Sequence, residues 1–322
     1  MAANKKLPRN RIVSLAPNVT SILLELGAGR DLVGVSKWCK DVADVGRRPQ
    51  VGDCWKMDVD EVMRLKPTML IGSVPFAPDT VTKLLAQPVT FVAINPRMLA
   101  DIERDIRVLG RIVNRAEGAE KLIRKMKHEF EKVARAARSH LINSSRQTAS
   151  KTFHQAMDSN TFRPDIASNA PRQGKPSAVL RQGTASAVPK SRSTPGVSTP
   201  EVRPRVYCEA WPKPRISSPP WVAELIDIAG GRMVVASGQR VTDEDVAAAN
   251  PEIIVLAWAA AGSRSKPASA LKNPAWRDVP AIKNRRVFVI RDEYLNTPGP
   301  PLIFGAWELL QMIHSAPAKG PE

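Results

Sequence analysis

Several short motifs are missing from this 322-residue sequence, and each absence narrows what the chain does. Cys39, Cys54 and Cys208 are the only cysteines, so the sequence has neither a disulfide framework nor a CxxC motif. The four histidines form no HExxH pair, which argues against a zinc site built by the protein. No GxGxxG follows the first apolar run, and neither GxSxG nor GxxxxGK followed by Ser or Thr occurs. The sequence therefore predicts no catalytic residues and no metal site, which favours a protein that is not an enzyme.

Long hydrophobic runs are absent as well. No stretch reaches the roughly 18–20 consecutive apolar residues that span a bilayer. The first 15 residues are basic but contain no separate apolar core of a secretory signal, because their one apolar run already predicts a strand. The sequence alone therefore leaves a cytoplasmic location open beside an exported one.

The net charge of +17 invites a nucleic-acid interpretation, but the charge is unevenly placed. Residues 138–205 hold eleven Lys and Arg against three Asp and Glu, which is +8 of the total. This segment is rich in Ser, Thr, Pro, Gln and Ala and has little apolar periodicity. We therefore expect residues 139–204 to be a low-complexity, disordered insertion, and we expect no specific nucleic-acid partner.

On both sides of that segment, short apolar runs alternate with helical patterns. Alternation of this kind indicates parallel sheets with helices on both faces, so the sequence predicts two α/β lobes, residues 1–115 and 205–322. The predicted strands are residues 11–16, 32–38, 69–72, 89–94, 205–210, 252–258 and 286–291. The predicted helices are residues 20–26, 58–66, 79–86, 99–113, 220–228, 244–249, 268–271 and 301–315.

The strongest helical signal, residues 116–138, lies between the two lobes. Leu122, Met126, Phe130 and Val133 recur at steps of three and four, which places them on one face, and Lys, Arg and Glu fill the other. Some twenty residues at about 1.5 Å each make a rod of roughly 30 Å, as long as a small domain is wide. We interpret this segment as a spine helix that joins the lobes.

One short unit occurs in both lobes. Residues 60–62 (Asp-Glu-Val) are followed by Lys-Pro at 66–67 and then by a predicted strand. Residues 244–246 (Glu-Asp-Val) are followed at the same spacing by Asn-Pro at 250–251 and another strand. The repetition predicts a pseudo-symmetric pair of lobes. Its acids either compensate the dipoles of two short helices or serve a partner.

Aromatic side chains gather where the predicted strands end. Ligands of parallel sheets bind outside the carboxyl ends of the strands, so aromatics collected there predict an apolar-walled cleft for a bulky, ring-rich ligand. The alternative for each tryptophan is that it caps a core. Trp221, Trp276 and Trp307 fall in helical patterns and are expected to be structural. The candidate ligand-binding residues are Trp38, Trp55, Trp211, Trp258, Asp292 and Tyr294.

These features together resemble a known family. RIVSLAPNVTSILLELGAGRDLVGVSKW and VGDCWKMDVDEVMRLKPTMLIGS are similar to the N-terminal lobe of substrate-binding proteins of cobalamin and ferric-siderophore ABC importers. WVAELIDIAGG, VTDEDVAAANPEIIVLAW and NPAWRDVPAIKNRRVFVI are similar to their C-terminal lobe. The resemblance covers residues 10–137 and 205–315 and is greatest to the cobalamin binders.

The resemblance implies an α/β fold of two Rossmann-like lobes joined by one long spine helix, with the ligand held between the lobes. It implies a monomer that captures cobalamin or a related corrinoid as its transported ligand, with no built-in cofactor, and hands it to an ABC transporter permease. In this family an acid on each lobe docks onto the permease. The matching residues here are Asp60, with Glu61 as an alternative, and Glu244. The resemblance also implies a periplasmic or other extracytoplasmic location.

Two alternatives to cobalamin transport stay open at this point. A ferric-siderophore or haem binder of the same family would use cationic groups toward an anionic chelate, and Lys213, Arg215 and Arg291 could supply them. A cytosolic corrinoid-binding protein would fit a start that carries no secretory signal.

Overall fold

The computed structural model describes residues 9–53, 56–158, 203–259 and 267–315, with only the helix backbone for 144–158. The chain divides into two compact units, residues 1–140 with 203–322, and residues 141–202. Both lobes belong to the first unit, which holds all the sheets and sites below. No helix in the described residues is both long enough and apolar enough to cross a membrane.

The first lobe is built on a five-stranded parallel sheet with the order β3-β2-β1-β4-β5. Ile12 and Val13 of β1 and Leu70 and Ile71 of β4 are fully buried, as the continuous apolar runs in the sequence predict for a sheet covered on both faces. The strands are β1 (Ile12–Ser14), β2 (Leu32–Ser36), β3 (Gln50–Val51), β4 (Met69–Ser73) and β5 (Thr90–Ile94). The helices are α1 (Pro17–Glu25), α2 (Val59–Arg64), α3 (Pro78–Leu85) and α4 (Leu99–Ile112).

The second lobe contains two strands that the sequence did not predict, β7 and β8, and β7 departs from the expected parallel sheet. β6 pairs in parallel with β8 and β9, and β9 with β10, but β7 runs antiparallel to β6. The reason is the short turn at Lys213 and Pro214, because a two-residue connection joins only antiparallel strands. The strands are β6 (Arg205–Pro212), β7 (Arg215–Ser217), β8 (Arg232–Met233), β9 (Ile253–Leu256) and β10 (Val287–Val289). The helices are α6 (Pro220–Ile228), α7 (Asp243–Ala249), α8 (Ala268–Leu271), α9 (Pro280–Lys283), α10 (Glu293–Asn296) and α11 (Leu302–His314).

The two lobes repeat one arrangement. The order β2-β1-β4-β5 in the first lobe corresponds to β8-β6-β9-β10 in the second, with every pair parallel. The repeated unit in the sequence forms α2 with β4 and α7 with β9. Lys66 and Asn250, which follow the two helices, both have a φ of 50°, and each is followed by a proline. Since the left-handed conformation is uncommon outside glycine, its recurrence shows that the two units share a backbone path as well as a sequence pattern.

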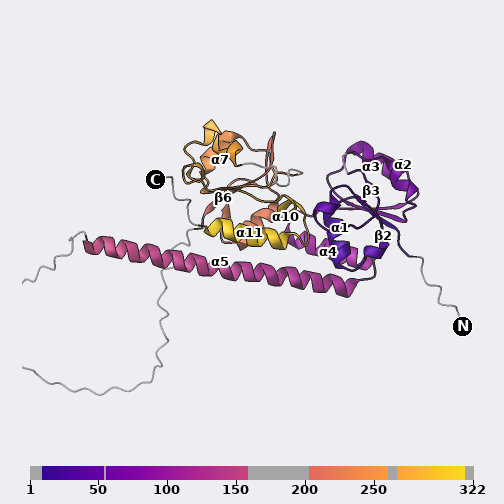
Figure 1. Ribbon diagram of the computed structural model, residues 1–322, viewed down its shortest axis with the longest axis horizontal. Helices are drawn as coiled ribbons and strands as arrows, with labels where there is room; N and C mark the ends of the chain where they lie inside the picture. Colours follow the sequence, from indigo (N-terminus) through magenta and orange to yellow (C-terminus); the bar gives the residue numbers. More distant parts are fainter. Residues whose placement is uncertain (1–8, 54–55, 159–202, 260–266, 316–322) are drawn as a thin grey trace, which may run out of the picture. The chain divides into compact units, whose positions relative to one another are not determined.

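The long helix α5 (Ala116–Asp158) follows the first lobe and extends twenty residues past the expected end at 138 (Figure 1). Its apolar face is buried at Leu122, Met126 and Val133. Residues 139–158 contain neither Gly nor Pro, so nothing in them stops a helix, although their Ser and Thr content suggests a segment without structure. The first part of the expected insertion is therefore helical, and its remainder lies outside the described residues.

The lobes and the spine share one hydrophobic cluster. It contains Ile22 of α1, Val133 of α5 and Leu309 of α11, and α11 lies along α5 (Figure 1). Two polar contacts also link these parts. Trp307 Nε1 donates to Glu129 Oε2 of α5 at 3.3 Å, and the Leu99 amide at the start of α4 donates to Glu224 Oε2 of α6 at 2.6 Å. The lobes are therefore packed into one body rather than linked by the helix alone.

The end of α11 packs against α5 through a pair of histidines. The burial of one of them predicts that the stability of the protein depends on pH. His314 stacks on His140 with ring centroids 4.8 Å apart, and its Nε2 lies 2.9 Å from the Ala229 carbonyl oxygen. Burial, with smaller contributions from His140 and Arg286, lowers the pKa of His314. The unfolded chain then binds more protons below the ordinary histidine pKa of about 6.5, so the free energy of unfolding should fall as the pH drops below that value.

The measurement is urea unfolding at a series of pH values. His314→Gln keeps a side chain that can donate to the Ala229 carbonyl but removes the titration, so its stability should vary less below pH about 6.5. His128→Gln, at an exposed site on α5, is the control and should follow the unaltered protein. The same pH slope in His314→Gln and the unaltered protein would contradict the assignment.

Candidate functional site

A cavity of about 830 Å³ lies between the lobes at the carboxyl ends of the strands. From the first lobe it is lined by the segments that follow β1, β2, β3, β4 and β5, and from the second by the end of β6 and the segments after β7, β9 and β10. This is the position at which open parallel sheets hold their ligands. Its size lies within the range of small-molecule sites, about 300–1,000 Å³.

Three of the expected ligand-binding residues line this cavity: Trp38, Trp211 and Asp292. Trp258 and Tyr294 do not line it, and Trp55 lies outside the described residues. Trp221, which the sequence suggested was structural, does line it, while its Nε1 donates to the Leu295 carbonyl at 2.8 Å. The cavity thus has indoles from both lobes, but not the full expected set.

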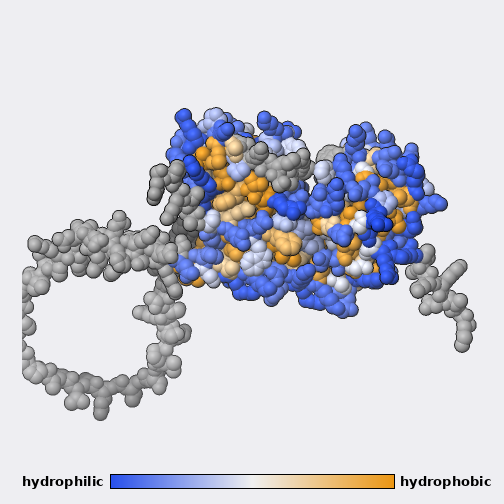
Figure 2. All heavy atoms as spheres, viewed as in Figure 1, coloured by the Kyte–Doolittle hydropathy of each residue, from blue (hydrophilic) through white to orange (hydrophobic). Residues whose placement is uncertain are grey.

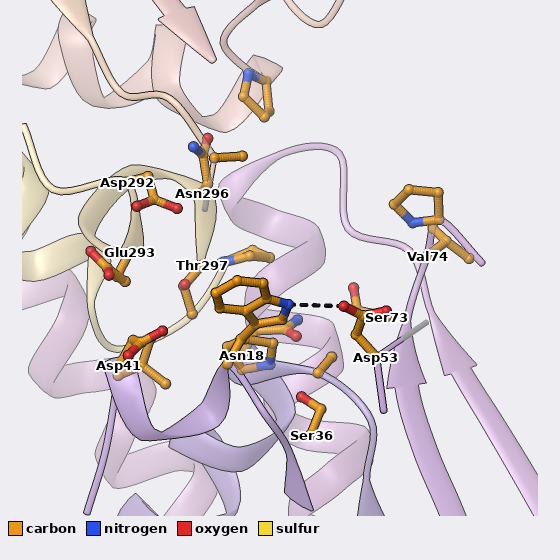
Figure 3. Close-up of a pocket in the computed structure, with 18 of the residues that line it drawn as sticks. Asn18, Ser36, Asp41, Asp53, Ser73, Val74, Asp292, Glu293, Asn296 and Thr297 are labelled. Carbon is orange, nitrogen blue, oxygen red and sulfur yellow. Dashed lines mark hydrogen bonds between the residues drawn. The ribbon is translucent and has the colours of Figure 1, made fainter. Parts of the chain in front are cut away.

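Trp38 is held by a buried carboxylate that the sequence analysis missed. Its Nε1 donates to Asp53 Oδ2 at 3.0 Å (Figure 3), and Asp53 is only 8% exposed. Asp53 Oδ1 accepts from the Lys56 amide at 2.9 Å, and Lys37 Nζ lies 2.9 Å from Oδ2. These contacts fix the indole plane before any ligand arrives, which lowers the entropy cost of binding. Asp53 lies two residues after β3, a strand that the sequence did not predict, so no signal in the sequence marked it.

Trp211 extends from the hairpin of β6 and β7. It is 41% exposed, an unusual state for so large an apolar side chain, and its Nε1 donates to the Lys213 carbonyl at 2.9 Å. The antiparallel β7 therefore has a direct consequence for the site, because it holds the strand that carries this indole over the cavity. Figure 2 shows hydrophobic residues exposed at several places on the surface of both lobes.

Trp258 points instead to a buried carboxylate. Its Nε1 donates to Glu209 Oε1 at 2.8 Å, and the Tyr207 hydroxyl donates to Glu209 Oε2 at 2.8 Å. The Arg215 guanidinium also pairs with Glu209, which is fully buried. Burial, together with the Glu209 charge, raises the pKa of Tyr207 far above its usual value, so this phenol stays neutral. In the structure the Trp258 indole is therefore hydrogen-bonded within the second lobe and does not line the cavity.

Arg215 connects that carboxylate to the start of α7. Its Nη2 lies 2.8 Å from Asp243 Oδ1, and its guanidinium stacks 4.4 Å from the centroid of Trp276. Arg215, one of the three cations considered for a siderophore, is therefore already paired within the protein. Tyr294 is likewise engaged, since its ring lies 5.4 Å from that of Phe304 and 5.3 Å from the Arg291 guanidinium.

The polar lining comes from residues that the sequence analysis did not single out. Asn18, at the start of α1, is 3% exposed, and its Nδ2 has no hydrogen-bond partner among the described residues. Asp41, Asp292 and Glu293 lie on one side of the cavity in Figure 3, and Asp53 lies on the other. Arg291 joins two of these segments, because its Nη2 donates to the Asp41 carbonyl at 3.4 Å and its Nε lies 3.4 Å from Glu293 Oε2.

No lining residue in the part of the chain that the structure describes is His, Tyr, Cys or Met. These are the side chains that bind haem iron axially. Within the same residues, no cluster of three or more His, Cys, Asp or Glu could hold a metal ion. Cys39 and Cys208 are buried, and burial raises the pKa of both thiols, which makes them poor nucleophiles.

The expected docking acids lie at two equivalent helix starts. Asp60 in the first turn of α2 and Glu244 in the first turn of α7 are both exposed, and neither side chain pairs with another described residue. Their neighbours are used locally, since Asp58 caps α2, and Asp245 forms a capping box with Thr242. Glu61, the alternative, corresponds in position to Asp245 rather than to Glu244.

Comparison with known proteins identifies the family. The profile of the periplasmic binding protein family matches residues 12–157 and 198–294. The chain belongs to this family. An uncharacterized ABC transporter substrate-binding lipoprotein of Bacillus subtilis, YvrC, is 22% identical over 96% of this chain and 81% of its own length. The vitamin B12-binding protein of Pectobacterium atrosepticum is 24% identical over 40% of this chain and 47% of its own length.

A solved structure shows the same fold. The periplasmic haem-binding protein RhuT of Roseiflexus sp. RS-1 superposes with a TM-score of 0.66 at 19% identity, covering 95% of this chain and 98% of RhuT. The match confirms the predicted class of two α/β lobes with a long helix. As a periplasmic binding protein, the chain is related to substrate-binding components of ABC importers.

Proposed function

We propose that this periplasmic binding protein captures a corrinoid, with cobalamin as the leading ligand, and delivers it to an ABC permease without catalysing a reaction. The observation that carries the proposal is the cavity between the lobes, walled by indoles from both and without a lining His, Tyr, Cys or Met among the described residues. Flat apolar walls suit a large ring, and a corrinoid brings its metal already coordinated by the ring. A haem would usually take an axial ligand from the protein.

Delivery requires contact with a permease, and the two exposed acids support it. Asp60 and Glu244 occupy the same position in the two repeated units, so they present a carboxylate from each lobe to a partner with matching symmetry. Charge-assisted hydrogen bonds to arginines would be the natural contact. Their equivalence favours Asp60 over Glu61 as the docking acid of the first lobe. An extracytoplasmic location is part of the proposal, supported by the similarity to the lipoprotein YvrC.

The test is calorimetric titration of the purified protein with cyanocobalamin, haem and a ferric siderophore, with tryptophan fluorescence corrected for inner-filter absorption. We expect saturable one-to-one binding of cyanocobalamin. Trp38→Ala and Trp211→Ala should each weaken it at least about tenfold, because burying a large apolar side chain contributes about 1.5–3 kcal/mol and each tenfold is about 1.4 kcal/mol.

Trp307→Phe is the matched control, because this indole packs on α5 away from the cavity and should leave the affinity unchanged. Binding of haem or a ferric siderophore, with none of cyanocobalamin, would keep the transport role and overturn the corrinoid. If Trp38→Ala and Trp307→Phe lost the same amount of affinity for cyanocobalamin, the ligand would have to bind outside this cavity.

A further inference from the structure

A second hollow lies between the lobes, apart from the main cavity of about 830 Å³. It has a volume of about 460 Å³ and is lined by residues 98–99 at the start of α4, by one face of α6 from Pro220 to Ile228, and by Ser237. We call it the α6 groove. None of its lining residues lines the main cavity, so it is a separate compartment of the space between the lobes.

The α6 groove adjoins the main cavity, because the same two segments line both. In the first lobe Pro96 lines the main cavity and Met98 lines the groove. In the second lobe Pro219 lines the main cavity and its neighbour Pro220 lines the groove. Since successive Cα atoms are about 3.8 Å apart, the two hollows meet across one or two residues of chain. From there the groove extends along about two turns of α6, as far as Ile228.

The polar part of the α6 groove offers hydrogen-bond acceptors from the second lobe. The Leu99 amide donates to Glu224 Oε2 at 2.6 Å, which holds the start of α4 against α6. Glu224 Oε1 and the Ser237 hydroxyl have no hydrogen-bond partner among the described residues. A carboxylate oxygen only accepts, whereas a serine hydroxyl both accepts and donates. A group with hydroxyl donors would therefore fit here without displacing the contact between the lobes.

The rest of the groove is apolar. Met98 is 41% exposed, an unusual state for a large apolar side chain, and Ile228 on the opposite lobe is partly buried. Ala223 lies on α6 between Pro220 and Ile228, and its single methyl group leaves the middle of the groove open. A flat apolar ring packs well against such walls, and methionine makes favourable contacts with aromatic rings. The groove thus fits a group that joins an apolar ring to several hydroxyls, as a nucleoside does.

Corrinoids differ in this kind of group. Cobalamin carries a nucleotide with an aromatic base and a ribose on one side chain of its ring, and cobinamide has the same ring without it. Building on the corrinoid function proposed above, we propose that the corrin ring occupies the main cavity and that the base and ribose of the nucleotide occupy the α6 groove. The protein then binds complete corrinoids in preference to those that lack the nucleotide.

The experiment compares two probes that share the corrin ring, its metal and its amide side chains. Cyanocobalamin carries the nucleotide, and the monocyano form of cobinamide does not. By calorimetry at neutral pH, cyanocobalamin should bind at least about tenfold more tightly, because only its nucleotide buries apolar surface in the α6 groove.

Variants assign the difference to the groove. Ala223→Phe fills the middle of the groove and should lower the affinity for cyanocobalamin to that for cobinamide, while the affinity for cobinamide stays unchanged. Met98→Ala removes an exposed apolar contact and should weaken the binding of cyanocobalamin alone, by about two- to fivefold. Ala116→Phe, at an exposed position at the start of α5, is the matched control and should leave both affinities unchanged. Circular dichroism and thermal unfolding check that each variant keeps its fold.

The outcomes separate the two proposals. Equal binding of the two probes, or tighter binding of cobinamide, would overturn the assignment of the groove and keep the corrinoid function. A ratio of the two affinities that Ala223→Phe and Met98→Ala leave unchanged would also overturn it, because the groove would then play no part in the difference. Failure of both probes to bind the unaltered protein would overturn the proposed function itself.

Discussion

Replacing Arg215 with Met should lower the free energy of unfolding by about 3–5 kcal/mol, the typical cost of breaking a buried ion pair. Its partner Glu209 is fully buried, while the Arg215 side chain is 20% exposed. The variant leaves the carboxylate in the lobe interior with two neutral donors, the Tyr207 hydroxyl and the Trp258 indole. An unfolding titration in urea measures the loss as a shift of the midpoint at constant slope.

A double-mutant cycle tests whether the broken ion pair with Glu209 causes this loss of stability. Glu209→Gln removes the buried charge, so adding it to Arg215→Met should recover part of the lost stability. Arg277→Met is the control at an exposed pair with Asp278 and should change stability by less than about 0.5 kcal/mol. Strict additivity of the two substitutions would show that the ion pair is not the source of the loss.

This network also links two parts of the proposed transport cycle. Arg215 begins β7, whose partner β6 carries Trp211 at the cavity, and it binds Asp243, the neighbour of the proposed docking acid Glu244. One guanidinium therefore contacts both the strand pair at the cavity wall and the helix α7, which we propose docks onto the permease. In the first lobe, α2 is capped locally by Asp58. Loosening of the second lobe would then disturb both ligand binding and docking.

The sequence predicted the lobes because periodicity and strand–helix alternation are local signals. It missed the strands β3, β7 and β8 and the helices α9 and α10, because elements of two to four residues are too short to show a periodicity of their own. It placed the first helix at residues 20–26, whereas α1 begins at Pro17 in the structure. Proline fits the first helical turn because its missing N–H has no partner there anyway.

The site was only partly predictable, because a strand end fixes the edge of the sheet but not the direction of a side chain. Side chains alternate between faces along a strand. Trp38 and Trp211 reach the cavity, whereas Trp258 turns toward Glu209, which comes from a different strand. Asn18 and Asp53 carry no motif, and only their packing between elements shows that they line the cavity.

The shared core gives the last prediction, which concerns cooperativity. Leu309 of α11 is fully buried in the cluster that also holds Ile22 of the first lobe and Val133 of the spine. Leu309→Ala should lower the free energy of unfolding by about 2–5 kcal/mol, because it removes apolar contacts and leaves a cavity. Ile22→Ala should have a similar effect from the opposite lobe. Leu85→Ala, at a site 68% exposed, should change little.

Cooperativity between the lobes decides how these losses are distributed. Native-state hydrogen exchange can follow β1 of the first lobe and β9 of the second in each variant. If one cluster stabilises both lobes, Leu309→Ala should speed exchange in β1 as well as in β9. Ile22→Ala, in the first lobe, should likewise speed exchange in β9 as well as in β1. Faster exchange confined to the substituted lobe would show two independently unfolding domains joined by α5. Faster exchange in both lobes would mean that the two walls of the cavity unfold as one unit. In the folded state the lobes would then keep the fixed spacing that a rigid ring requires.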